Sequence, residues 1–137
     1  NEGMPVTFPK GVGVEGAFFL FALVKDPERL GVPVFKGGEL PDPWDPDLIK
    51  IEEKPKNPKS KLAVTGFYIY PPSVFDVIAT LKPSKRGELE ITDVNNWYIE
   101  RKKCAYKVFR SFWSDAGTPE SLKEVTDWTY GKRGLDK

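Results

Sequence analysis

The sequence predicts an α/β protein in which helices pack against a sheet. Residues 17–24 form a continuous apolar run, which is typical of a strand covered on both faces, as in a largely parallel sheet. Further strand patterns alternate with helix patterns along the chain. The chain has 137 residues, 39% of them hydrophobic, which is enough for one domain with its own core. We therefore expect a layered α/β sheet in a single domain over residues 1–137, with residues 1–16 as an irregular lead-in.

The other predicted strands are short, and strand-breaking residues lie at their ends or within them. Pro33 interrupts the first of them and predicts an edge position or a bulge. Gly66 lies inside another, where a backbone or ligand approaches closely or a bulge sits. A loop over residues 37–46 contains Trp44, which we expect to pack the loop against the domain. The expected strands are residues 31–35, 48–53, 62–70 and 104–109.

Three helices are expected from capping residues and apolar spacing. In the first, Val74, Val77, Ile78 and Leu81 share one face, which predicts contact with the core. The start of the last helix is marked most strongly, since Pro119 follows a threonine. Gly131, which follows the apolar pattern, predicts the end of this helix. The expected N-caps are Ser73, Thr92 and Thr118, and the expected last residues are about Leu81, Lys103 and Tyr130.

Composition excludes several classes of function. The formal net charge is +1, which provides no overall field for nucleic acid or an anionic membrane, so neither is expected as a partner. Since no run approaches the roughly 18 apolar residues of a membrane span and no cleavable signal is visible, we expect a cytoplasmic location. The single cysteine, Cys104, and the absence of histidine exclude an internal disulfide, a cysteine-based zinc site and the usual nucleophile–histidine pairs. Catalysis would then depend on positioning, charge and an oxygen-ligated metal.

Charged residues at strand ends and in loops form three candidate clusters. Glu53 and Lys54 end a strand before a proline, where they are either an exposed ion pair or part of a binding site. Arg86 offers a fork of donors to phosphate, and its alternative is a surface pair with Glu88 or Glu90. Asp115 is a candidate Mg²⁺ ligand, or an acid of ordinary turn and capping chemistry. Together these groups suit a phosphorylated sugar and phosphoryl-type transfer.

Five motifs in this order resemble those of the sugar-phosphate nucleotidyltransferases, and within that family those of the glucose-1-phosphate thymidylyltransferases. The resemblance covers most of the chain after Gly16. It implies a portion of a Rossmann-like nucleotidyltransferase fold, with a mixed sheet flanked by helices. The motifs are Asp26-Pro27-Glu28-Arg29-Leu30-Gly31-Val32, Glu53-Lys54-Pro55, Ala63-Val64-Thr65-Gly66-Phe67-Tyr68, Arg86-Gly87-Glu88-Leu89-Glu90-Ile91-Thr92-Asp93 and Trp113-Ser114-Asp115-Ala116-Gly117-Thr118.

The resemblance also implies roles for individual residues. The reaction would join a sugar 1-phosphate, most closely glucose 1-phosphate, to a nucleoside triphosphate, most closely dTTP, with release of pyrophosphate. Glu53 would bind sugar hydroxyls, Lys54 and Arg86 would bind the sugar phosphate, and Asp115 would share the Mg²⁺ cofactor. The expected catalytic residues are Lys54, Arg86 and Asp115, and the expected substrate-binding residues are Gly31, Glu53, Lys54, Val64, Gly66, Tyr68 and Arg86.

The chain departs from the family pattern at its front. The glycine-rich signature that holds the triphosphate and the Gly-Asp pair that supplies a second metal carboxylate have no counterpart in the 137 residues. We therefore expect a C-terminal fragment that is inactive alone. Its exposed sheet edges would favour self-association into a homo-oligomer, although the sequence does not determine the oligomeric state. Two alternatives stay open: a portion of a uridylyltransferase acting on UTP and glucose 1-phosphate, and a non-catalytic module that binds sugar phosphates.

Overall fold

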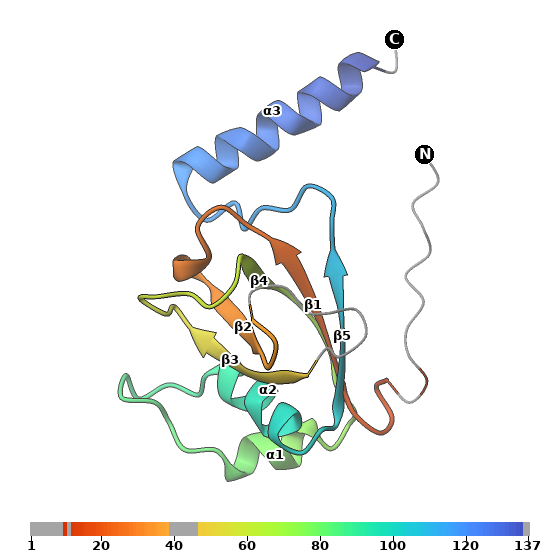
Figure 1. The fold of residues 1–137 in the computed structure, drawn as a ribbon, viewed down its shortest axis with the longest axis vertical. Coiled ribbons are helices and arrows are strands. Elements are labelled where there is room, and N and C mark those ends of the chain that lie inside the picture. The colour runs from red at the N-terminus through yellow and green to blue at the C-terminus, as the bar shows by residue number, and fades with distance from the viewer. Residues whose placement is uncertain (1–9, 11, 39–46, 136–137) are drawn as a thin grey trace.

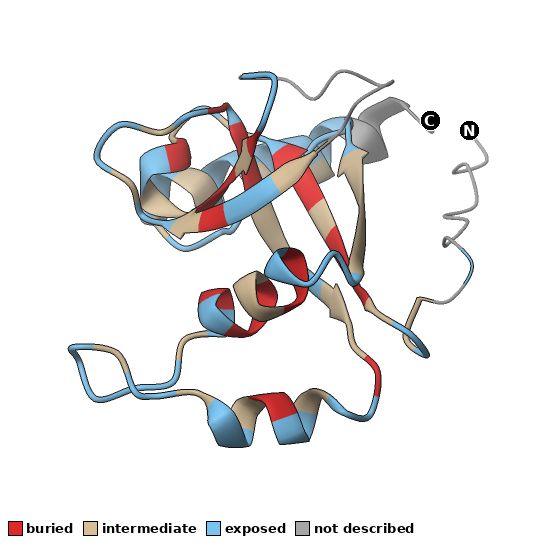
Figure 2. Ribbon diagram, turned by 60° about the horizontal axis from the view of Figure 1, so that its bottom comes forward, coloured by how far each residue is buried: buried red, intermediate tan, exposed pale blue. Residues whose placement is uncertain are grey.

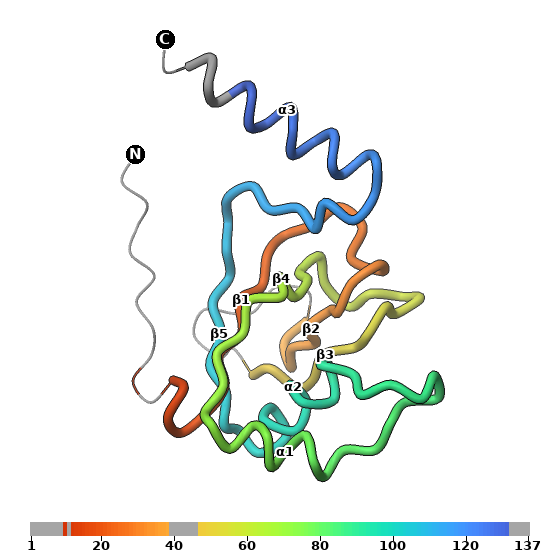
Figure 3. The backbone as a smooth tube through the Cα atoms, turned by 180° about the vertical axis from the view of Figure 1, so that it is seen from behind, coloured from red at the N-terminus to blue at the C-terminus, as the bar shows by residue number. Residues whose placement is uncertain are grey.

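The central feature of the fold is a mixed three-stranded sheet (Figure 1). The computed structural model describes residue 10, residues 12–38 and residues 47–135, with side chains up to residue 131. Strand β1 (Ala17–Leu23) lies between β4 (Leu62–Ile69), which is antiparallel to it, and β5 (Cys104–Phe109), which is parallel to it. Figure 3 shows the three strands side by side from behind. The expectation of a largely parallel sheet was therefore wrong for one of the two neighbours of β1.

A second sheet consists of β2 (Gly31–Phe35) and β3 (Leu48–Glu53), which pair antiparallel with Pro33 opposite Ile51. The carbonyl of Pro33 accepts a hydrogen bond from the Ser60 hydroxyl at 3.1 Å. The backbone N–H and C=O groups of Ile51 both bind the side chain of Asn96. At this pair, therefore, both backbones turn away from each other, so a proline without an N–H breaks no ladder bond. The edge position predicted from Pro33 is confirmed.

The core lies between the two sheets and one helix, α2 (Ile91–Glu100). Phe19 and Phe21 of β1 are completely buried, and the ring of Phe21 packs edge-on against Phe35 of β2. Figure 2 shows buried residues on the strands and on α2, with fewer on α1 (Val74–Thr80). In Figure 1, α1 and α2 lie at one end of the sheet and α3 (Pro119–Leu135) projects from the other. A short 3₁₀ helix, η1 (Pro27–Arg29), follows β1.

Of the predicted N-caps, Thr92 was wrong, and Ser73 occupies the N-cap position of α1 without capping it through its side chain. Ser73 precedes α1 in a helical conformation and makes no side-chain capping bond, because the carbonyls of Pro71 and Pro72 accept the first N–H groups of the helix. Thr92 lies inside α2, which begins at Ile91 after Glu90. It is buried, and its hydroxyl binds Glu53 instead of the helix backbone. Both hydroxyl residues are typical of a helix start in sequence. In the structure, neither side chain caps its helix.

The ends of two helices also differ from the expected ones. Helix α2 ends at Glu100 instead of Lys103, because β5 starts at Cys104. Helix α3 continues through Gly131 to Leu135, and the cost of a glycine inside a helix, about 1 kcal/mol, is insufficient to end it. The predicted N-cap of α3 is confirmed, since Thr118 Oγ1 accepts the N–H of Ser121 at 3.1 Å. Trp44 lies outside the described residues.

Gly66 marks a bulge in β4. The register between β1 and β4 shifts between Phe19 and Phe21, and Gly66 has a φ of +83°. The hydroxyl of Thr65 donates to the carbonyl of Leu20 at 2.9 Å, so a side chain replaces a ladder bond there. No atom lies within 4 Å of the position that a Cβ would take at Gly66. Of the two structural alternatives, the bulge is the one found.

None of the described helices is long and apolar enough to cross a bilayer.

Candidate functional site

Three of the predicted sugar-binding residues come together where β2, β3 and β4 meet. Gly31 and Glu53 are register partners on β2 and β3. A Cβ at Gly31 would lie 2.9 Å from Cγ2 of Val64 and 3.5 Å from Oε2 of Glu53. A Cβ would also lie 3.3 Å from Cγ2 of Ile51, so glycine is needed here for the close packing of Val64, Ile51 and Glu53 against β2. We call Gly31, Glu53, Val64 and Tyr68 the sugar group.

The carboxylate of Glu53 is oriented by α2. Thr92 Oγ1 donates to Oε2 of Glu53 at 2.7 Å, and Thr92 is 6% exposed. An ionised carboxylate has several acceptor sites and no donor, so this bond leaves capacity for further donors. Glu53 is itself exposed, so hydroxyl groups from solvent or from a ligand can reach it.

Tyr68 completes the sugar group. Its ring packs edge-on against Phe19 and tilts over Tyr70, at centroid distances of 6.3 and 5.8 Å. Burial raises the pKa of Tyr68, the Asn95 side chain lowers it, and the Glu53 charge raises it. The phenol is therefore protonated at neutral pH.

Lys54 leaves the strand abruptly. Its φ of +44° is in the left-handed region, which is unfavourable for a residue with a Cβ. Its N–H donates to the carbonyl of Leu30 at 3.0 Å, which anchors the turn. The ammonium helps to lower the pKa of Glu90, after the larger effects of Arg86. The predicted strand end is confirmed, and Lys54 emerges beside the sugar group.

Arg86 is paired within its own segment. Its Nη2 donates to Oε1 of Glu90 at 2.7 Å, and this bond raises the pKa of Arg86. Of the two partners considered from the sequence, Glu88 and Glu90, the structure therefore shows Glu90. The charge of Glu53 also acts on Arg86, though more weakly than the charges of Glu90 and Glu88. Binding of a phosphate by Arg86 therefore requires this exposed ion pair to open or to be shared.

Asp115 lies beside the turn that follows β1. It lines a cleft of about 850 Å³ between the turn after β1 and the start of α3, together with Arg29 and Leu30. Arg29 donates to Asp26 at 2.7 Å and lies 3.5 Å from Asp115. None of Glu53, Val64, Tyr68 and Arg86 lines this cleft. Leu30 connects the two places, because it lines the cleft and its carbonyl accepts the Lys54 N–H.

The described residues fit a metal ion only in part. Among them, no group of three or more histidine, cysteine, aspartate or glutamate residues could hold one. Asp115 supplies a single carboxylate, which suffices for Mg²⁺ only where phosphates and water complete the shell. A cation there would compete with Arg29 for the same oxygen.

A polar stripe on α2 was missed by the sequence reasoning, which used only the apolar spacing of that helix. Thr92 binds Glu53, Asn95 binds Tyr70, and Asn96 binds the backbone of Ile51. The three polar residues are three and four positions apart, so they share one helical face. A search for polar residues at helical spacing, instead of apolar ones alone, would have found them.

Comparison with known proteins shows the family. The "Nucleotidyl transferase" family model matches residues 10–130. The chain belongs to the nucleotidyl transferase family. A glucose-1-phosphate thymidylyltransferase of Neisseria gonorrhoeae is 43% identical over 107 residues, which are 77% of this chain and 35% of that protein. One of Mycolicibacterium smegmatis is 39% identical over 82% of this chain and 37% of its own length.

Two solved structures of nucleotidyl transferases have the same fold. One is a glucose-1-phosphate thymidylyltransferase from Bacillus anthracis in complex with a sucrose, 49% identical, with a TM-score of 0.68 over 82% of this chain and 42% of that one. The other is a UDP-glucose pyrophosphorylase complexed with UDP-glucose, 27% identical, with a TM-score of 0.70 over 85% of this chain and 45% of that one. The predicted Rossmann-like α/β fold is confirmed. The chain thus spans less than half the length of these relatives.

Proposed function

We propose that this chain is the sugar-phosphate-binding part of a nucleotidyl transferase that joins glucose 1-phosphate to dTTP and releases pyrophosphate. Relatives named glucose-1-phosphate thymidylyltransferase support the sugar and the base. The observation that carries the proposal within this chain is the sugar group, where Gly31 and Val64 pack beside the carboxylate of Glu53, which Thr92 orients. An acceptor-only carboxylate suits the several hydroxyl donors of a sugar.

The proposed roles follow from the placement of the charged residues. Glu53 binds sugar hydroxyls, the Val64 backbone and Tyr68 contact the same sugar, and Gly66 lets the bulged strand approach the ligand. Lys54, which follows Glu53 directly, holds the phosphate of the bound sugar, because a compact ammonium suits a phosphate oxygen. Arg86 adds a second cation when its exposed pair with Glu90 opens.

The chemistry needs no side-chain base. An ionised oxygen of the sugar phosphate attacks the α-phosphorus of the triphosphate, a new P–O bond forms, and the bond to pyrophosphate breaks in line. Lys54 and Arg86 neutralise negative charge during this step. Asp115 would hold Mg²⁺ at the edge of its cleft, and the metal would supply further neutralisation of the phosphates. Because the triphosphate signature of the family has no counterpart in the 137 residues, we expect the chain alone to bind sugar phosphate without turnover.

Calorimetry with glucose 1-phosphate tests the proposal. Lys54→Asn removes the ammonium and keeps a residue that tolerates the left-handed backbone, so it separates loss of charge from strain. We expect roughly 10-fold to 100-fold weaker binding, the value of a charge-assisted hydrogen bond. Lys59→Ala, in the exposed loop that follows, is the matched control and leaves the affinity unchanged. Equal affinity of wild type and Lys54→Asn removes Lys54 from the site.

A second candidate is a uridylyltransferase portion, which the fold similarity to UDP-glucose pyrophosphorylase supports. The readout is the nucleotide-sugar made when the chain is extended to the full length of its relatives. A preference for UTP over dTTP favours this candidate, and nucleotide-sugar formation by the 137-residue chain alone refutes the expected inactivity. Binding of sugar phosphate without turnover by the extended chain favours a non-catalytic module.

A further inference from the structure

Helix α3 carries an exposed apolar stripe. Leu122, Val125 and Trp128 recur at intervals of three residues, so they lie on one side of the helix. Leu122 is 55% exposed and Trp128 is 41% exposed. The ring of Phe112, which precedes the helix and is also exposed, stacks on Trp128 at a centroid distance of 5.0 Å. We call Phe112, Leu122, Val125 and Trp128 the α3 stripe.

The described residues do not bury the α3 stripe. In Figure 1, α3 projects from the end of the sheet opposite α1 and α2, and Figure 2 shows no buried residue on its described side chains. The ion pair between Lys25 and Glu124 reaches α3 from the turn after β1, but both side chains are more than half exposed, and such pairs contribute little. An amphipathic helix of a globular domain normally buries its apolar side, so a further surface is expected to cover this one.

The covering surface belongs to the family domain. The family model includes α3 up to Tyr130, so the helix is part of the shared domain and not an appendage to it. The relatives are more than twice as long as the part of them that this chain matches. A large part of the domain thus has no counterpart among the 137 residues, and α3 offers it an apolar face.

The position of the stripe indicates which part of the domain covers it. Glu120, Ser121 and Glu124 of α3 line the cleft of about 850 Å³ that Asp115 also lines. In the proposed reaction, Asp115 shares Mg²⁺ with the reacting phosphates, so the part of the enzyme that holds the triphosphate must lie against this cleft. The α3 stripe begins at Leu122, the residue after Ser121, and is therefore continuous with the wall of the cleft.

We propose that the α3 stripe is the docking surface for the triphosphate-binding part of the enzyme. Leu122 and the stacked rings of Phe112 and Trp128 are the buried centre of this contact, and the charged residues beside them form its polar rim. The docking brings the triphosphate to the cleft of Asp115. This role rests on the proposed function, because it treats the chain as one part of a longer nucleotidyl transferase.

Solvent exposure of Trp128 tests the docking. The 137-residue chain is compared with the same chain extended at its front by the leading portion of the Bacillus anthracis relative. Both are labelled with 5-fluorotryptophan, and the Trp128 signal is the ¹⁹F NMR line that Trp128→Phe removes. An exposed fluorine changes its chemical shift between H₂O and D₂O. We expect this change for Trp128 in the 137-residue chain and its loss in the extended chain.

A pair of variants measures the stability that docking contributes. Leu122→Gln removes apolar surface but keeps a good helix former. We expect it to lower the Tm of the extended chain by about 3–10 °C, the effect of losing one buried leucine, and to leave the Tm of the 137-residue chain unchanged. Tyr130→Gln is the matched control, because Tyr130 is 67% exposed and lies two positions from Trp128, which places it away from the stripe. It should change neither Tm.

A second copy of the chain is the competing occupant, and dilution separates the two. Protection of Trp128 by the leading portion of the same chain is independent of concentration. Protection that disappears when the extended chain is diluted would refute the docking role and assign the α3 stripe to a homodimer. Two separate unfolding transitions in the extended chain, with Trp128 exposed, would refute it as well, because docked parts unfold together.

The outcomes also separate the docking role from the proposed function. If the extended chain makes nucleotide-sugar while Trp128 stays exposed, or while Leu122→Gln leaves the Tm unchanged, the docking role is wrong and the proposed function stands. If Trp128 is protected and Leu122→Gln lowers the Tm, but no nucleotide-sugar forms, the docking role stands and the proposed function fails.

Discussion

The side chain of Asn96 on α2 makes two hydrogen bonds to the backbone of β3, as a neighbouring strand would. Its Oδ1 accepts the N–H of Ile51 at 2.8 Å, and its Nδ2 donates to the carbonyl of the same residue at 2.9 Å. Ile51 is 2% exposed, and its backbone groups point away from β2, where Pro33 is its register partner. One side chain therefore satisfies both polar groups of a buried strand residue.

Asn96→Ala leaves these two groups buried without a partner. An unsatisfied buried polar group costs about 1–3 kcal/mol, so we expect the loss of both bonds to lower the free energy of unfolding by about 2–6 kcal/mol. Urea unfolding followed by tryptophan fluorescence measures the change. Glu100→Ala is the control on the same helix, because Glu100 is exposed and its ion pair with Arg101 is 3.8 Å long. Its expected effect is within about 0.5 kcal/mol.

A loss below about 1 kcal/mol in Asn96→Ala would refute the reasoning, because it would mean that water or a neighbouring group reaches the Ile51 backbone. The substitution also tests how the sugar group is held. Thr92 on the same helix binds Glu53 on the same strand, so a loosened contact between α2 and β3 should also weaken the binding of glucose 1-phosphate.

Other parts of the fold give further predictions. Phe21→Ala empties a completely buried position and should lower the free energy of unfolding by about 3–5 kcal/mol in the same urea experiment. Thr118→Ala removes the N-cap bond to Ser121 and should destabilise α3 by about 1 kcal/mol, seen as lost helicity by circular dichroism; Thr126→Ala, inside the same helix, should lose none. Burial raises the pKa of Cys104 to about 11, so alkylation by iodoacetamide should rise with pH to a midpoint near that value, and a midpoint near 9 would contradict it.

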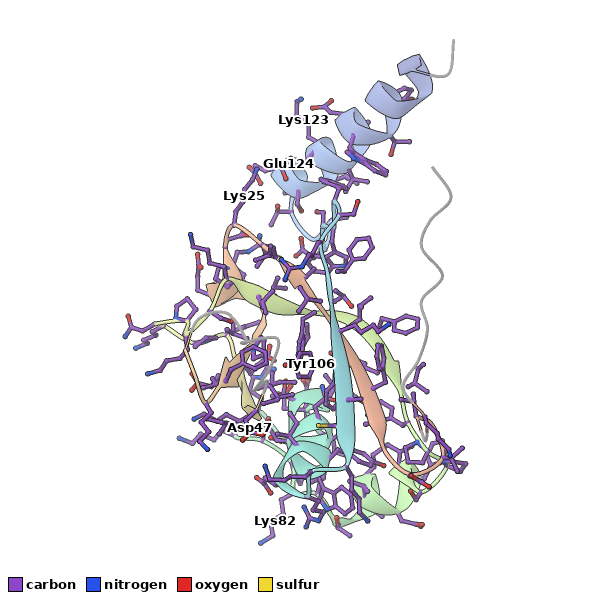
Figure 4. All side chains as sticks on the ribbon, turned by 45° about the vertical axis from the view of Figure 1, so that its right-hand side comes forward. Lys25, Asp47, Lys82, Tyr106, Lys123 and Glu124 are labelled. Carbon is purple, nitrogen blue, oxygen red and sulfur yellow. The ribbon has the colours of Figure 1, made fainter. Side chains whose placement is uncertain are left out.

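The helix caps show where local reasoning worked and where it failed. Thr118 starts α3 as predicted, and residues 119–131 of that helix include no buried side chain, so local capping chemistry decides there (Figures 1 and 2). In Figure 4, Lys25 reaches from the turn after β1 to Glu124 on α3, with a distance of 3.0 Å. Thr92 carries the same signal in sequence but is buried, and Glu53 competes successfully for its hydroxyl. Capping preferences therefore predict a helix start best where nothing else can use the hydroxyl.

For the candidate site too, the sequence predicts some features and only the structure shows others. The family resemblance in the amino-acid sequence led us to expect sugar, phosphate and metal chemistry at Glu53, Lys54, Arg86 and Asp115. Their arrangement does not follow from it, because the sequence distance between two residues does not determine whether they meet. The structure joins Gly31, Glu53 and Val64 from three strands, pairs Arg86 with Glu90, and places Asp115 in a separate cleft beside Arg29.

The amino-acid sequence was sufficient to predict the α/β class, the position of every described strand to within a residue, and the family. Strands are predicted by local signals, namely apolar runs that end at proline or glycine, and the observed strands follow these signals closely. Tertiary contacts were needed to establish that β1 has neighbours of opposite direction and that the polar face of α2 holds both β3 and the sugar group. These outcomes depend on which buried donors meet which acceptors across long stretches of chain, 39 positions for Thr92 and Glu53, 45 for Ile51 and Asn96, and 87 for Ala17 and Cys104.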